Sequence, residues 1–169
     1  MLYSNKKVLN RNFKNLYCIL LFSLGMFSSV PSFAQDKEMQ RTTAGKIKDS
    51  ALGELSGLVA SRTHKGMFWT HNDSGDLGRI FLLDGQAKLR ATFNLEGIVA
   101  LDMEDIAWHT VGDKNYLLLG DIGDNLKKRK SIKLYCFEEP TLQAGQSVYT
   151  IPAAAIRTIT LGYPDQPRD

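Results

Sequence analysis

The chain has 169 residues, 43% of them hydrophobic, which is enough to bury one ordinary core. Its formal net charge is +3, but the first 34 residues hold four basic side chains and no acidic one. The remainder therefore carries 17 basic and 18 acidic residues and is close to neutral. The apparent basicity belongs to the N-terminal segment and gives no case for a nucleic-acid partner.

Residues 1–34 have the pattern of a secretory signal peptide. Basic residues precede an apolar run of about 11 residues, from Leu16 to Met26, and small residues end the segment at Ala34. The run is too short to span a bilayer, so we predict a cleaved leader and no stable membrane anchor afterwards. The protein is expected to be exported, to the periplasm or the extracellular space. Cys136 is then the single cysteine left, and no intrachain disulfide is expected.

Residues 35–50 are polar and are predicted to form a linker or a loosely held lead-in strand. A first unit follows at 51–101. Its short apolar or alternating segments, separated by turn residues, predict four strands. These lie at 54–59, 67–69, 79–83 and 89–95.

A second unit, at 102–169, repeats the same order of features. Four strands are predicted at 104–109, 116–119, 132–137 and 156–161, with an insertion around 139–145. The two units are offset by 50 residues at Glu54 and Glu104, and by 48 at a shared Asp-x-Gly-Asp motif.

Four short strands repeated at this period are typical of β-propeller blades. We therefore predict an all-β fold with four-stranded antiparallel blades. Because a propeller has 4–8 blades and this sequence encodes about two, the chain is interpreted as the N-terminal part of a longer propeller. A β-sandwich built from the same eight strands is the alternative.

Acidic residues recur at matching places in both units. The motif reads Asp73-Ser-Gly-Asp76 in the first and Asp121-Ile-Gly-Asp124 in the second. In a propeller, the loops that hold these motifs and the loops that hold Glu54 and Glu104 lie on one face. The carboxylates are therefore expected to converge on one rim, where they suit a hard cation such as Ca²⁺.

Turn chemistry is the alternative explanation of the acidic motifs. Aspartate caps backbone N–H groups and glycine takes positive φ, so a Gly-Asp turn needs no ion. Nearby, Asp102, Glu104 and Asp105 are candidates from which two could serve as a general acid and a general base. The basic run 127–130 is interpreted as a solvated loop, with contact to an anionic partner as the alternative.

Four motifs give the chain a resemblance to a group of exported bacterial β-propellers related to the TolB-like and gluconolactonase/phytase-like propellers. They are Glu54-Leu-Ser-Gly-Leu, His71-Asn-Asp-Ser-Gly-Asp, Glu104-Asp-Ile-Ala and Gly120-Asp-Ile-Gly-Asp-Asn. The resemblance covers roughly residues 50–169. It implies a six-bladed fold and a divalent ion at the axial rim, held here by Glu54, Glu104 and Asp121.

Two functions are compatible with these observations. The first is a binding or scaffold module of the cell envelope, with a small molecule or an envelope protein as partner and Ca²⁺ as the expected ion. The second is a metal-dependent hydrolase of a lactone, ester or phosphoester, whose activity needs further blades. The candidate metal ligands in both are Glu54, Asp73, Asp76, Glu104, Asp121 and Asp124.

Overall fold

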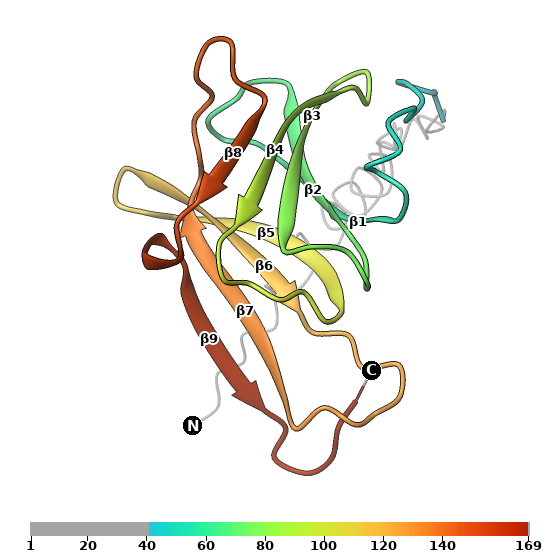
Figure 1. Ribbon diagram of the computed structural model, residues 1–169, viewed down its shortest axis with the longest axis vertical. Helices are drawn as coiled ribbons and strands as arrows, with labels where there is room; N and C mark the ends of the chain where they lie inside the picture. The colour runs from blue at the N-terminus through green and yellow to red at the C-terminus, as the bar shows by residue number, and fades with distance from the viewer. Residues whose placement is uncertain (1–40, 169) are drawn as a thin grey trace, which may run out of the picture. The chain divides into compact units, whose positions relative to one another are not determined.

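The computed structural model describes residues 41–168, which form two β-sheets (Figure 1). No α-helix occurs in this range, and the helical content is one 3₁₀ turn at Ala153–Ala155. The strands are β1 (Leu55–Ala60), β2 (Met67–Asn72), β3 (Arg79–Asp84), β4 (Leu89–Leu95), β5 (Met103–Val111), β6 (Lys114–Asp121), β7 (Ser131–Glu138), β8 (Val148–Ile151) and β9 (Arg157–Gly162).

The first sheet has the order β1-β2-β3-β4-β8. Its first four strands are consecutive in the chain and antiparallel, so each is joined to the next by a short turn. β8 then pairs in parallel with β4 at the far edge. The second sheet has the order β5-β6-β7-β9 and is antiparallel throughout. Neither sheet closes on itself.

The prediction of an all-β fold is confirmed, and each of the eight predicted strands corresponds to an observed one. Residues 41–50 of the predicted lead-in form no strand, and the predicted leader lies outside the described residues. Two open sheets packed on each other fit both a sandwich and part of a propeller.

β8 was not predicted, and it joins the sheet of the other unit. It lies in the insertion between β7 and β9, so the chain leaves the second sheet, pairs with β4 and then returns. Tyr149 and Ile151 turn inward, and the Tyr149 ring stacks on Phe93 with 4.4 Å between ring centroids. This packing on an existing edge stabilises a strand that is only four residues long.

The main core lies between the two sheets. Alternation along β3 and β4 points Ile80, Leu82, Ala91 and Phe93 toward it, while Leu117 and Leu119 enter from β6. Each large side chain buried in this way contributes about 1.5–3 kcal/mol. A smaller cluster of Leu52, Phe81 and Leu83 covers the other face of the first sheet.

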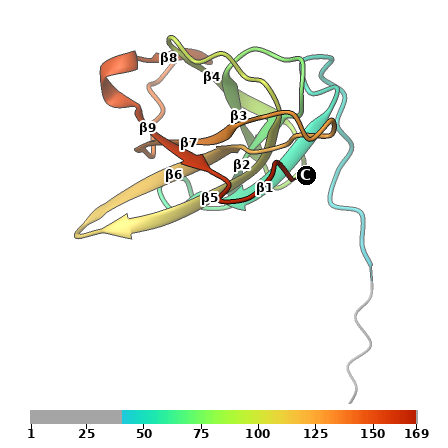
Figure 2. The same cartoon turned by 90° about the horizontal axis from the view of Figure 1, so that it is seen from below.

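The two sheets meet along their first strands, β1 and β5, which lie side by side (Figure 2). Ser56 Oγ donates a hydrogen bond of 3.0 Å to the Glu104 carbonyl. Gly57 has φ +60°, and a Cβ at this position would lie 2.6 Å from His71 Nε2 and 3.0 Å from the Ile106 nitrogen. A glycine is therefore required here by both its conformation and its neighbours.

A buried carboxylate, Glu139, joins the two sheets again beyond the other end of β1. It follows β7 and is 5% exposed. Five groups donate to it: Ser61 Oγ (2.6 Å), Arg62 N (3.1 Å), Thr63 N (3.2 Å), Thr63 Oγ1 (2.9 Å) and Trp69 Nε1 (2.7 Å). The turn after β1 and the indole of β2 thus close around a residue from the second sheet.

The charge of Glu139 predicts a pH dependence of stability. Burial alone would raise the pKa of this carboxyl group, but hydrogen bonds from Ser61, Trp69 and Thr63 outweigh burial and lower the pKa below its usual 4.5. The folded state therefore binds the proton less readily than the unfolded state does. The stabilisation is fully present above pH 4.5 and is lost as the pH falls through the lower, folded value.

A Glu139→Gln variant provides the measurement, because glutamine does not titrate. We expect the wild-type protein to exceed the variant in free energy of unfolding near neutral pH, and the difference to shrink below pH 4.5. Urea denaturation at a series of pH values measures both proteins. A difference that stays constant, or widens, as the pH falls would contradict the role assigned to the charge.

Candidate metal centre

Three carboxylates gather beside the junction of β1 and β5. Asp73 follows β2, Asp102 precedes β5, and Glu104 is the second residue of β5. One ligand atom from each residue lies within 4.8 Å of the other two. The three residues come from both sheets, so the cluster forms only when the sheets are packed together. Two of its members, Asp73 and Glu104, are among the ligands predicted from the sequence.

The position of Asp102 is set by the second acidic motif. The Asp102 N–H donates to Asp121 Oδ1 at 3.0 Å. Its carbonyl accepts from the N–H groups of Ile122 (3.0 Å) and Gly123 (3.1 Å). Asp121 is fully buried and forms a salt bridge of 2.8 Å with Arg129. Asp121, one of the ligands predicted from the sequence, lies outside the group of three, and its carboxylate contacts the backbone of Asp102.

Gly123 allows this loop to approach the carboxylates closely. A Cβ at residue 123 would lie 2.4 Å from Glu104 Oε1 and 2.5 Å from Asp102 Cγ. The matching glycine of the first motif, Gly75, has φ +82° and faces open space. The same motif therefore needs glycine for two different reasons, packing in the second copy and backbone conformation in the first.

The backbone of Glu54 positions Asp73. The Glu54 carbonyl accepts a hydrogen bond of 2.8 Å from the Asp73 N–H, which ties the end of β2 to the start of β1. Glu54 itself is exposed, and it lies outside the group of three whose ligand atoms converge. The repeated glutamates thus have different surroundings, since Glu104 belongs to the cluster.

The last acidic residue of each motif serves its own loop. Asp76 forms a salt bridge of 2.7 Å with Arg79 and accepts from Asn72 Nδ2 at 2.7 Å. Burial would raise the pKa of Asp76, but the hydrogen bonds to Arg79 and Asn72 help to lower it overall. Asp124 accepts from the N–H groups of Lys128 (2.9 Å) and Arg129 (2.7 Å). Asp124 thus caps backbone N–H groups, as the turn explanation expects, whereas Asp76 bonds to two side chains, and both lie outside the group of three.

The donor set of the cluster fits a hard divalent cation. Three carboxylates offer oxygen ligands only, which is the preference of Ca²⁺ and Mg²⁺. Carboxylates this close repel one another unless a cation or bound protons offset the charge. The Asp102 Oδ1 atom is buried, which strengthens electrostatic interactions at that position. Ca²⁺ takes 6–8 oxygen ligands, so one oxygen from each of three carboxylates would fill only part of its coordination shell.

A buried histidine lies beside the cluster. His71 is fully buried, and its Nδ1–H donates to the Asn72 carbonyl at 2.8 Å, which leaves Nε2 without a proton in the neutral ring. Burial lowers the pKa of His71, although the Asn72 hydrogen bond and the charges of Asp105 and Asp73 oppose the shift. The imidazole is therefore neutral at pH 7 and adds no positive charge to the junction.

Asp102 was not among the metal ligands predicted from the sequence. The sequence feature that could have identified it is its spacing from Glu104. The two residues lie on either side of the first residue of a strand, which brings two carboxylates to one end of that strand. Asp102 was considered only as part of an acid–base pair. Its contact with Asp73 depends on how two sheets pack, and a single sequence does not display that packing.

No family model, curated protein or solved structure matches this chain. In residues 41–168, no helix has the length and apolar character to cross a membrane.

Proposed function

We propose that the chain is a divalent-cation-binding β-propeller module of the cell envelope, with the ion held by Asp73, Asp102 and Glu104. The observation that carries this proposal is the convergence of three carboxylates from two sheets within 4.8 Å. The ion would bridge the sheets and offset the repulsion among the carboxylates. Its role in this proposal is structural, since it fixes a binding surface at the junction.

The strand order supports the propeller within this proposal. Each sheet contains four strands in chain order, apart from the inserted β8, and the two sheets meet through their first strands. In a propeller, the first strand of each blade lies nearest the axis. The carboxylate cluster, beside β1 and β5, then lies at the axial rim. Export, through the segment 1–34, is part of the same proposal.

Calcium is expected to stabilise the protein against heat. A ligand that binds only the folded state at 100 times its Kd adds about 2.7 kcal/mol, and each kcal/mol raises Tm by about 2–4 °C for a chain of this size. We expect Asp102→Asn to abolish most of this rise, because it removes one of three charged ligands. Differential scanning calorimetry with and without CaCl₂ measures the effect.

Asp113→Asn is the matched control, since Asp113 lies in the exposed β5–β6 turn and outside the cluster. This variant should keep the full calcium-dependent rise in Tm. Equal rises in the wild-type protein and in Asp102→Asn would mean that any bound ion sits elsewhere. The absence of a rise in the wild-type protein, with Mg²⁺ as with Ca²⁺, would refute the cation proposal.

The hydrolase alternative differs in what Glu104 does. If the module binds or scaffolds, Glu104→Gln should remove ion binding and lower Tm in calcium without removing any reaction. If it is a hydrolase, the same change should remove both divalent binding and turnover of lactone, ester or phosphoester substrates. A panel of such substrates, tested with both proteins, separates the two functions.

A further inference from the structure

The loop between β6 and β7 ends in a basic tip with an exposed leucine. Lys127, Lys128 and Lys130 are exposed to solvent. Leu126, beside them, is 72% exposed. A solvated loop, the interpretation favoured by the sequence over contact with an anionic partner, explains the exposed lysines but gives no role to the exposed leucine.

Hydrogen bonds to Asp124 hold the backbone of the tip in one conformation. Asp124 accepts hydrogen bonds from the backbone of Lys128 and Arg129, and its carbonyl accepts from Lys127 N at 2.6 Å. Lys127 has φ 52°, the left-handed conformation of a tight turn. The backbone at the tip is therefore ordered by the loop's own carboxylate.

The other charges of the loop are directed inward. Arg129 Nη1 donates to Asp121 Oδ1 and to the Gly123 carbonyl, both at 2.8 Å. Asp121 is fully buried and Asp124 is 5% exposed. Both acids are thus shielded, and the charge that faces solvent at the tip belongs to the three lysines.

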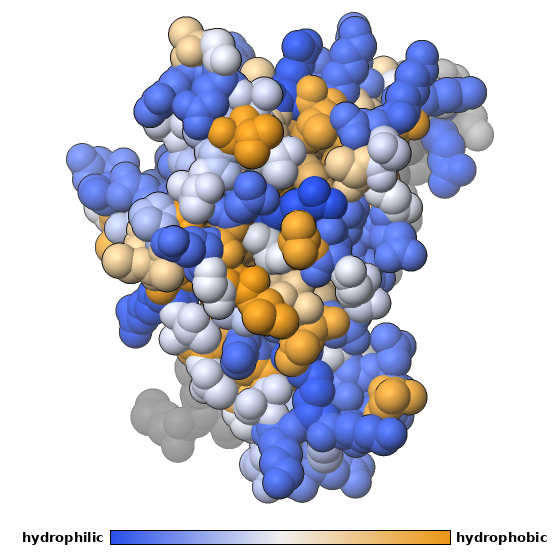
Figure 3. Space-filling view, viewed as in Figure 1, coloured by the Kyte–Doolittle hydropathy of each residue, from blue (hydrophilic) through white to orange (hydrophobic). Residues whose placement is uncertain are grey.

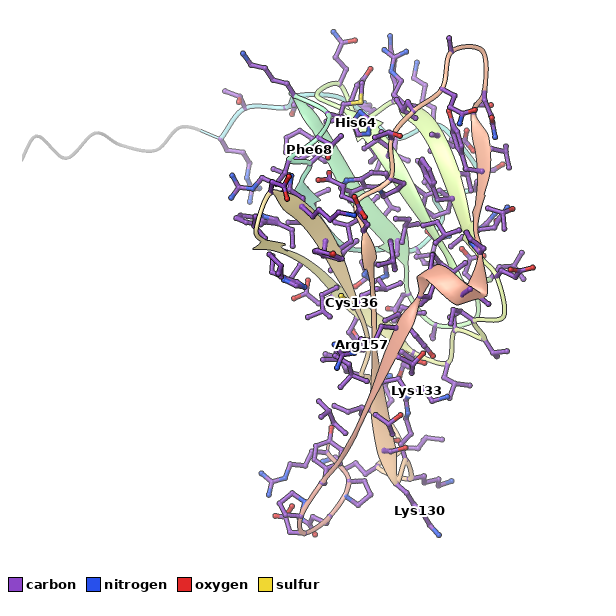
Figure 4. The ribbon with its side chains drawn as sticks, turned by 90° about the vertical axis from the view of Figure 1, so that its left-hand side faces the viewer. His64, Phe68, Lys130, Lys133, Cys136 and Arg157 are labelled. Atoms are coloured by element: carbon purple, nitrogen blue, oxygen red, sulfur yellow. The ribbon has the colours of Figure 1, made fainter. Side chains whose placement is uncertain are left out.

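The tip lies at one end of the second sheet, away from the bulk of the first. Figure 3 shows this end, at the bottom of the view, as mainly hydrophilic, with an isolated hydrophobic group at the lower right. Lys130 points away from the molecule at the far end of β7 (Figure 4). In the neighbouring segment after β9, Asp165 pairs with Arg168, so these two charges offset each other.

We propose that this tip docks the protein on a membrane surface that contains anionic lipids. The lysine ammonium groups would contact lipid phosphates, and Leu126 would enter the boundary between headgroups and acyl chains. Basic residues gain about 1 kcal/mol each near an anionic leaflet, which corresponds to about a fivefold increase in partitioning per lysine. Entry of Leu126 into the membrane would bury apolar surface, whereas a polyanion dissolved in water offers no apolar environment for this side chain.

A nucleic acid is a poorer match for the same tip. Single-stranded nucleic acids are bound through aromatic stacking as well as basic charge, and no aromatic residue occurs in 125–130. Residues 35–169 as a whole are close to neutral, so no broad basic surface extends from the tip. The lipid proposal does not rest on the proposed cation site, which uses other side chains.

Vesicle sedimentation of residues 35–169, the chain without the predicted leader, tests the proposal. The probes are vesicles of phosphatidylcholine alone and vesicles that also contain phosphatidylglycerol. We expect binding to the anionic vesicles only, weakening as salt is raised. The double variant Lys127→Glu/Lys128→Glu should bind at least about 25-fold more weakly, and Leu126→Ser should also weaken binding.

Two variants control for charge and exposed apolar surface elsewhere. Lys65→Glu changes an exposed lysine in the β1–β2 turn. Leu77→Ser changes a leucine that is 70% exposed in the β2–β3 loop. Both should bind like the wild-type protein. Equal binding by the tip variants, no binding to anionic vesicles, or a preference for an oligonucleotide over vesicles would each overturn the proposal. Circular dichroism confirms that the variants are folded.

Discussion

Replacement of Glu139 by alanine is expected to lower the free energy of unfolding by about 3–5 kcal/mol, which is a large part of the stability of a small domain. The change removes an acceptor that serves five donors and leaves the Trp69 indole N–H buried without a partner. Each buried donor left unsatisfied costs about 1–3 kcal/mol, although water entering the site would satisfy some of them.

The neighbouring residue provides the control for this prediction. Glu138 forms a salt bridge with Lys114, and both side chains are 55% exposed. Such an exposed pair is screened by solvent and contributes little, so Glu138→Ala should change stability little. Urea denaturation of the two variants measures the contrast. Similar losses for both would mean that Glu139 does not join the sheets in the way its hydrogen bonds indicate.

Gly57→Ala is expected to cost about 2–4 kcal/mol, because two penalties add. Alanine is disfavoured at φ +60°, and its Cβ would lie 2.6 Å from His71 Nε2. Relief of that contact would require His71 or β5 to move, and both lie in the packed junction between the sheets. Thermal and urea denaturation give the loss in stability.

Gly66→Ala separates the two penalties. Gly66 has φ +75°, but nothing lies within 4 Å of the position that a Cβ would take. Alanine there should cost only the backbone term, about 1–2 kcal/mol. If the two variants lose the same stability, β1 and β5 are not packed as closely as described, and the carboxylate cluster beside them loses its support.

Strand positions were predictable because they depend on local patterns. Segments such as Ile132 to Phe137 alternate between the two faces of a sheet, and turn residues separate them from the next strand. β8 is different, since four residues give little periodicity and its partner, β4, lies more than fifty residues earlier in the chain. Pairing at that separation depends on tertiary packing.

The candidate site was predictable only in part, for a related reason. Aspartate in a turn has the same sequence signal whether it caps backbone N–H groups, as Asp124 does, or faces other carboxylates, as Asp73 does. The choice depends on what the other sheet brings nearby. Asp121 illustrates this. It is buried beside Arg129 and positions the backbone of Asp102, yet its motif has the same residues that an ion-holding motif would have.

The repeated motif therefore has two roles in this molecule. Its second copy packs against Asp102 and Glu104 and also begins the basic loop between β6 and β7. Its first copy contributes Asp73 to the cluster. A cation at the junction would connect the ends of β2 and β5, and would hold in one arrangement the sheets that Gly57 and Glu139 already join.

Isothermal titration calorimetry of the protein with CaCl₂ tests the central claim, a cation site shared by two sheets, most directly. We expect saturable binding of one ion per chain in the wild-type protein. Asp73→Asn, from the first sheet, and Glu104→Gln, from the second, should each lose binding, and Asp113→Asn should retain it. Absence of binding in the wild-type protein, or binding that survives both substitutions, would contradict the account.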